Sequence, residues 1–183
     1  MKTAGIKNSP WVVSIGGFRP RKALELKGLI REAAEAAAPQ LAQLFDADMV
    51  AGYDHLFMAA VNAARSMETG LAVSKSITVE ALLYASTQDQ ITKALVMMGL
   101  SKERGRIALM VFAKGREEAE TAYGRVARFL GNEDDGVLDL DDDKRERLKV
   151  AYRIGDAELE AAGGGKALGS LIVERGALLS LRR

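Results

Sequence analysis

Cysteine is absent from this chain of 183 residues, and histidine occurs only once. The lack of cysteine excludes disulfide bonds, thiolate nucleophiles and cysteine-ligated zinc together. No apolar run approaches the roughly 20 residues that span a bilayer, and the first residues lack the apolar core of a signal peptide. We therefore expect a soluble, cytoplasmic protein that binds no cofactor and no membrane.

The chain also lacks an excess of either charge. Its 26 basic and 25 acidic residues leave a formal net charge of +1, so no overall field attracts nucleic acid and any RNA site must be local. Aromatic residues make up only 5% of the chain, which disfavours a strong stacking platform for bases. The length suits one globular domain spanning residues 1–183.

The order of the expected elements predicts an α+β fold. Apolar and β-branched runs predict strands over 11–18, 41–50 and 107–113, and a short edge strand containing Val137, Leu138 and Leu140. Helical spacing predicts helices over 20–39, 54–70, 119–130, 144–152 and 167–181. The first of these helices has an inner stripe of Leu26, Ile30, Ala33 and Ala37, and Asp143 is the expected N-cap of the fourth. We expect one domain in which several helices cover a small mixed or antiparallel sheet.

Residues 73–100 predict two further short helices joined by a polar corner. The apolar spacing of Val79, Leu82 and Leu83 indicates the first helix, and Ile91, Ala94, Leu95 and Met98 indicate the second. Thr87 and Gln90 fit a capping box at the start of the second helix, and Gly99 is the expected left-handed stop. The corner is either a simple capped turn or a recognition site, and the spacing alone allows both.

Motifs for catalysis are incomplete. The glycine cluster at 163–165 is followed by a lysine, as in a phosphate-binding loop, but Ala167 replaces the Ser or Thr that would hold magnesium. The acidic run at 139–143 resembles the start of a calcium loop, but Lys144 occupies the glycine position. A small-molecule enzyme would have to place its chemistry near His55 and Glu80.

Three segments carry a resemblance to a known family. The first, residues 45–110, contains DADMV, DHLFMAAVNAAR, VSKS, EALLYAS and a QI dipeptide ahead of MGL. The second is NEDDGVLDLDDDKRERL at 132–148, and the third is LIVERGALLSLRR at 171–183. In this order the segments resemble the small accessory subunit of the KEOPS complex, the family of the kinase-binding protein TPRKB. Two departures are Thr87, where the family usually has glycine, and a longer linker at 155–170.

The resemblance implies a non-catalytic subunit that binds the KEOPS kinase. It also implies that the complex recruits tRNA, including its 3′ CCA end, for threonylcarbamoyladenosine modification. The C-terminal helix, 167–182, is the implied kinase-binding element, and its apolar residues surround much of its circumference. The expected kinase-binding residues are Leu171, Ile172, Glu174, Arg175, Leu178, Leu179 and Leu181. The expected RNA-binding residues, if the helix ends converge, are His55, Asn62, Arg65, Lys75, Ser86, Thr87, Gln88 and Gln90.

Two other classes of function remain open at the level of the sequence. One is the small-molecule enzyme that uses His55 and Glu80. The other is a helical adaptor that captures a protein partner without binding RNA.

Overall fold

The computed structural model describes residues 1–20, 26–100 and 105–182. Its five-stranded sheet has the order β1-β2-β4-β3, and all of its paired strands are antiparallel. The strands are β1 (Lys2–Gly5), β2 (Val12–Arg19), β3 (Leu41–Asp46), β4 (Ile107–Ala113) and β5 (Asn132–Glu133), which pairs with the end of β2. Together with the helices, this sheet confirms the α+β fold.

Strand β4 forms the centre of the molecule because all seven of its residues are buried. Side chains alternate between the two faces of a strand. Ile107, Leu109 and Val111 therefore belong to one apolar core, whereas the intervening residues of β4 belong to another. The sequence run 107–113 is continuously apolar because both faces of this strand are covered.

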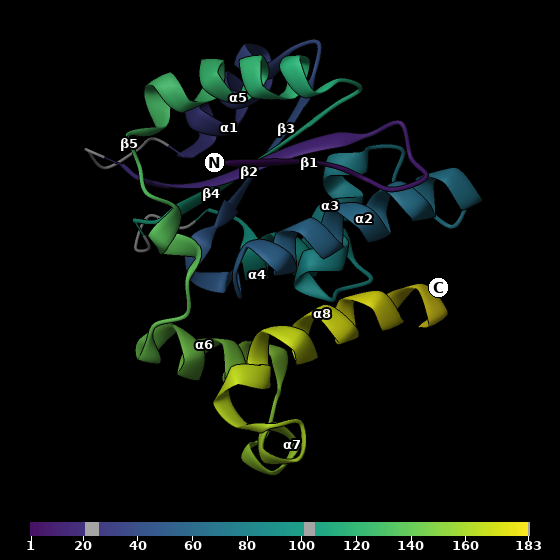
Figure 1. Ribbon diagram of the computed structural model, residues 1–183, viewed down its shortest axis with the longest axis vertical. Coiled ribbons are helices and arrows are strands. Elements are labelled where there is room, and N and C mark those ends of the chain that lie inside the picture. Colours follow the sequence, from purple (N-terminus) through teal and green to yellow (C-terminus); the bar gives the residue numbers. More distant parts are fainter. Residues whose placement is uncertain (21–25, 101–104, 183) are drawn as a thin grey trace.

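Helices cover both faces of the sheet (Figure 1). One layer contains α1 (Leu26–Ala37) and α5 (Arg116–Leu130), and the other contains α2 (Tyr53–Thr69), α3 (Ile77–Ser86) and α4 (Ile91–Met98). Beyond the second layer lie α6 (Asp142–Tyr152), α7 (Asp156–Ala161) and α8 (Leu168–Leu178), which continues into a 3-10 turn, η4 (Leu179–Arg182). No helix in the described ranges is both long and apolar enough to cross a bilayer.

Helix α8 packs against α2 and α3 through Leu168, Ile172 and Gly176. A Cβ atom at Gly176 would lie 2.9 Å from the carbonyl oxygen of Tyr84. The glycine therefore allows a close approach between α8 and the end of α3. This approach positions the C-terminal helix beside the polar corner.

Several predicted boundaries are confirmed. The strand at 107–113 has the predicted limits, and the predicted 11–18 strand corresponds to β2. Helix α2 ends at Gly70, whose φ of 74° is left-handed, and α5 ends before Gly131. Glycine tolerates such backbone angles without a steric cost.

Other predicted boundaries were wrong for local reasons. The strand predicted over 41–50 ends at Asp46, because the Asp46 carboxylate accepts a hydrogen bond from the backbone of Asp48 and starts a 3-10 turn, η1 (Ala47–Met49). The predicted edge strand around Val137 and Leu138 is instead a 3-10 turn, η2 (Asp135–Leu138).

Two details of the predicted helices also differ. Asp141, rather than Asp143, caps α6, because its side chain accepts a hydrogen bond of 2.7 Å from the amide of Lys144. On α1, Ile30 is exposed and Leu29 takes the inner position. The predicted start of α1 after Pro20 lies outside the described residues. The predicted connection at 160–165 contains the end of α7 and the start of a 3-10 turn, η3 (Gly164–Ala167).

Two glycines give a test of this packing. A Cβ atom at Gly17 of β2 would lie 2.4 Å from Val137 Cγ2 and 2.7 Å from the carbonyl oxygen of Asp134. Gly124, in contrast, lies at an exposed position of α5, where an added Cβ atom would meet open space. We expect Gly17→Ala to lower the free energy of unfolding by about 1–3 kcal/mol because of overpacking. Gly124→Ala is expected to raise it by about 0.5–1 kcal/mol because alanine favours the helix. Urea denaturation measures both changes, and a neutral Gly17→Ala would contradict the close packing of η2 on β2.

Candidate functional site

The polar corner, residues 86–90, joins the C-terminus of α3 to the N-terminus of α4. Helix α3 ends at Ser86, and Thr87 adopts a left-handed conformation with φ of 55°. The Thr87 amide donates to the carbonyl of Tyr84 at 3.2 Å, which helps to close the last turn of the helix. The predicted capping box was wrong, because Gln90 is the residue at the N-cap of α4 and makes no side-chain cap bond. Gly99 ends α4 as predicted, but the predicted left-handed conformation was wrong, since its φ is −66°.

A cleft of about 690 Å³ lies between this corner, the end of α6, α7 and α8. Such a volume is typical of a ligand site. The corner and α4 contribute Thr87, Gln88, Asp89 and Lys93 to its lining. The opposite side contributes Arg153, Glu158, Leu171, Glu174, Arg175, Leu178 and Leu179. The cleft thus brings together residues from both predicted sets, the RNA-binding corner and the kinase-binding helix.

The charges that line the cleft are balanced. Its cations are Lys93, Arg153 and Arg175, and its carboxylates are Asp89, Glu158 and Glu174. Arg175 donates to both carboxylate oxygens of Glu158, at 2.7 and 2.8 Å. Lys93 and Arg153 make no side-chain ion pair within the described part of the chain. These two cations are available to a ligand.

Only part of the predicted kinase-binding set lies on a surface. Glu174, Leu178 and Leu181 are exposed, and Leu181 retains 78% of its accessible surface. Leu171 and Arg175 are half-buried. Ile172 and Leu179, in contrast, are buried in the chain's own core, where they attach the terminal helix to the rest of the domain.

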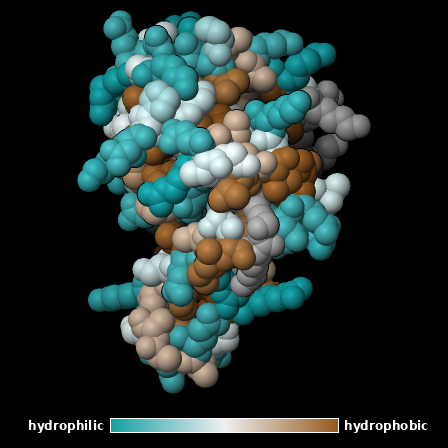
Figure 2. Space-filling view, turned by 90° about the vertical axis from the view of Figure 1, so that its right-hand side faces the viewer, coloured by the Kyte–Doolittle hydropathy of each residue, from teal (hydrophilic) through white to brown (hydrophobic). Residues whose placement is uncertain are grey.

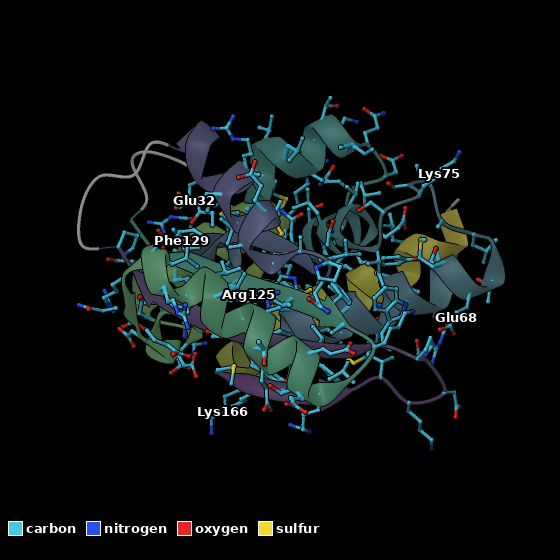
Figure 3. All side chains as sticks on the ribbon, turned by 90° about the horizontal axis from the view of Figure 1, so that it is seen from above. Glu32, Glu68, Lys75, Arg125, Phe129 and Lys166 are labelled. Atoms are coloured by element: carbon cyan, nitrogen blue, oxygen red, sulfur yellow. The ribbon has the colours of Figure 1, made fainter. Side chains whose placement is uncertain are left out.

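The predicted RNA-binding residues do not converge on one site. Ser86 is completely buried, and its hydroxyl donates to the carbonyl of Leu83. Thr87 and Gln88 line the cleft, and Gln90 is exposed at the start of α4. Lys75, which Figure 3 labels, precedes the start of α3, whereas the corner follows the end of this helix. Lys75 is not among the residues that line the cleft.

The other three members of that set, His55, Asn62 and Arg65, lie on α2. Arg65 is exposed near the C-terminal end of this helix, whereas Asn62 is half-buried. Asn62 and His55 line a small hollow against α8 that has no free volume for a water molecule. The hollow cannot hold a substrate in this arrangement.

His55 is a buried structural residue. The amide of Ala51 donates to His55 Nδ1 at 3.0 Å, so Nε2 carries the proton and donates to the carbonyl of Ala85 at 2.9 Å. Burial, with a smaller effect of the positive charge of Lys144 in the same direction, lowers the pKa of His55 to about 4. Both ring nitrogens are used by the backbone, and neither is free to act as a general base.

Glu80, the second residue of the enzyme alternative, is also engaged by the backbone. Its side chain is fully buried, and Oε1 accepts hydrogen bonds from the amides of Val73 and Ser74 at 2.8 and 2.7 Å. This carboxylate fixes the loop that precedes α3. The pair does not form a reaction centre.

The sequence motifs did not predict the structural roles of two cations, Lys144, which is fully buried, and Arg106, which is partly buried. Lys144 is fully buried, and its Nζ donates to the carbonyls of Val137 and Leu138 at 2.9 and 3.0 Å. Burial lowers the pKa of Lys144 to about 8. Arg106 bridges the carboxylates of Asp48 and Asp141. No spacing in the charged run 139–147 distinguishes Lys144 from the exposed residues around it.

The unique histidine gives a test of this site. We expect its imidazole to remain neutral from pH 7 to about pH 5, because its pKa in the folded protein is about 4. Between pH 6.5 and 4 the unfolded chain binds a proton that the folded chain does not, so the free energy of unfolding falls with decreasing pH, by up to about 3 kcal/mol. NMR titration of the single histidine resonance and urea denaturation across this range check both effects. Titration near pH 6.5, or a His55→Gln variant with the same pH dependence of stability, would contradict the buried neutral ring.

Comparison with known proteins agrees with the sequence motifs. The model of the family described as kinase binding protein CGI-121 matches residues 22–179. The "Regulatory protein Cgi121" of Methanocaldococcus jannaschii is 29% identical over 113 residues, which cover 61% of this chain and 70% of that protein. Both descriptions concern binding or regulation. Because the family match covers most of the sequence, the chain belongs to the family of the kinase-binding protein CGI-121.

Proposed function

We propose that this protein is a non-catalytic accessory subunit of a KEOPS complex. It binds the kinase of that complex and helps to recruit tRNA, through its 3′ CCA end, for threonylcarbamoyladenosine modification in the cytoplasm. The observation that carries the proposal is the family match over residues 22–179, with its description as a kinase-binding protein. The name of the M. jannaschii relative, a regulatory protein, supports the same class of function.

The exposed side of α8 and η4 is the surface we propose for the kinase, and it shares Glu174 and Leu178 with the lining of the cleft. Leu178 and Leu181 expose apolar side chains there, beside the exposed carboxylate of Glu174. Figure 2 views the side of the molecule that carries the C-terminus. It shows apolar side chains between the main body and the lower part of the molecule, which contains α7. Exposed apolar groups rimmed by charge are typical of protein interaction sites.

The cleft is the surface we propose for the RNA end. Single-stranded RNA is bound through hydrogen bonds to base edges and through cations that contact phosphates. Thr87 and Gln88 offer hydrogen-bonding groups, and Lys93 and Arg153 offer positive charge. Lys75 and Arg65, at the other end of α2 and α3, would contact phosphates farther from the 3′ end.

The geometry argues against the small-molecule enzyme. His55 and Glu80 bind backbone groups, and the hollow beside His55 has no free volume. The helical adaptor differs from our proposal only in RNA binding. A tRNA-binding measurement distinguishes the two.

The kinase surface can be tested on exposed residues of the terminal helix. We expect the double variant Leu178→Asp/Leu181→Asp to weaken binding of the KEOPS kinase from the same organism by about tenfold or more, because charges would replace apolar contacts at the interface. Isothermal titration calorimetry measures the affinity. Truncation of α8 is a poor test, because it also removes Ile172 and Leu179 from the core.

A matched control is Val96→Asp/Val150→Asp. Both valines are at least 80% exposed, and they lie on α4 and α6 rather than α8. This variant carries the same added charge and should bind the kinase as tightly as the unmodified protein. Equal affinities for the two double variants would place the kinase elsewhere on the molecule.

The RNA role can be tested with Lys75→Glu. We expect this variant to bind tRNA more weakly. The slope of log affinity against log salt concentration should become shallower by about one, as for the loss of one phosphate contact. Kinase binding should remain unchanged. Binding of tRNA with and without its terminal CCA, measured by fluorescence anisotropy at several salt concentrations, completes the test.

The control for this variant is Lys166→Glu, an equal change of charge at an exposed position of η3. It should leave tRNA binding nearly unchanged. If removal of the CCA end has no effect on binding to the unmodified protein, the cleft does not hold that end. If no tRNA binds at all, the adaptor alternative is correct.

A further inference from the structure

Helix α7 is attached to the rest of the protein by few contacts. It contains no buried residue, and it is followed by Gly163 and Gly164, whose φ values of 112° and 80° are left-handed. Its polar attachments are the pair between Glu158 and Arg175 and the pair between Asp156 and Lys149, at 2.6 Å. Elements with few buried contacts open at low free-energy cost. The Glu158 pair is therefore the main polar contact between α7 and α8.

Arg175 is held in place independently of Glu158. It extends from α8, which is rooted in the core by Ile172 and Gly176. One terminal nitrogen of its guanidinium contacts the carbonyl of Tyr152 and lies 3.3 Å from the carbonyl of Arg153. Among the described residues, the other terminal nitrogen donates to Glu158 alone. If α7 moves away, the guanidinium stays and that nitrogen faces the cleft.

Displacement of Glu158 would change the charge of the cleft. With α7 in place, three cations face three carboxylates. Without Glu158, the same three cations face only Asp89 and Glu174. An arginine fixed by backbone carbonyls is well suited to bind a phosphate, because its remaining N–H groups are already oriented. The open cleft therefore favours an anion more strongly than the closed one.

We propose that Arg175 forms an anion-binding site, that the carboxylate of Glu158 fills this site when RNA is absent, and that an RNA phosphate displaces the carboxylate. Displacement breaks the Glu158–Arg175 pair, transfers the guanidinium to the phosphate and releases α7 from α8. This proposal rests on the RNA binding proposed above and adds a means of regulating it. We call the Glu158–Arg175 pair, which holds α7 against α8, the latch. The latch keeps the cleft electrically balanced while RNA is absent.

The test compares two neutralised carboxylates of the same cleft. Glu158→Gln removes the competitor for Arg175, whereas Glu174→Gln makes the same change of charge at a residue without an ion pair in the described part of the chain. We expect Glu158→Gln to bind tRNA about threefold more tightly than Glu174→Gln, as for the release of a partly exposed ion pair. In an Arg175→Gln background this difference should vanish. Fluorescence anisotropy at fixed ionic strength measures the affinities.

Hydrogen exchange provides a second measurement. We expect residues 156–162 to exchange faster when tRNA binds the unmodified protein, and to exchange fast in Glu158→Gln without RNA, while α8 remains protected. Equal or weaker tRNA binding by Glu158→Gln, or slower exchange of α7 in the complex, would overturn the latch and leave the RNA role intact. Absence of tRNA binding by the unmodified protein would overturn the RNA role, and the latch with it.

Discussion

The arrangement of the site depends on one buried carbonyl group, that of Ala85. The last four carbonyls of a helix have no partner within the helix, and a buried one must be bonded from elsewhere. His55 Nε2 and the Tyr152 hydroxyl donate to the Ala85 oxygen at 2.9 and 2.8 Å. These bonds join the start of α2 and the end of α6 to the end of α3. The cleft exists because these three helix ends are held at one point.

The need of helix-end carbonyls for a hydrogen-bond donor also explains the positions of several basic side chains. Arg175 binds carbonyls at the end of α6, Lys144 binds those at the end of η2, and Arg125 binds the carbonyls of Ala36 and Ala37 at 2.7 and 2.9 Å. Figure 3 shows Arg125 on α5 beside α1. Basic side chains at helix C-termini also interact favourably with the helix dipole. The count of basic residues in the sequence is therefore larger than the number of cations that remain free to contact a partner. Where RNA can bind depends on the basic side chains that are not already bonded to backbone carbonyls.

Periodicity and glycine stops were sufficient to predict most of the elements. The strand 107–113 follows from a continuous apolar run bounded by charge, and the helix 54–70 follows from apolar residues at helical spacing. The caps were less predictable, because the polar stretches at 86–90 and 139–143 each contain several residues able to cap a helix, and tertiary packing selects among them. Burial of His55 and Ile172 was beyond sequence reasoning. Both α2 and α8 carry suitable groups on several sides. The packing of these two helices against each other decides which sides are covered, and the sequence does not specify that packing.

Thr87 shows how the family pattern and this chain differ physically. The position is left-handed, a conformation that glycine adopts without a steric cost, and glycine is the residue that the family resemblance implies here. A β-branched residue in this conformation is rare, and an L-residue there has a conformational cost of about 1–2 kcal/mol. The threonine side chain is half-buried at the cleft, where it adds a hydroxyl and a methyl group that glycine lacks. Since the turn itself would be more stable with glycine, the turn does not account for the threonine, whose hydroxyl is one of the hydrogen-bonding groups that line the cleft.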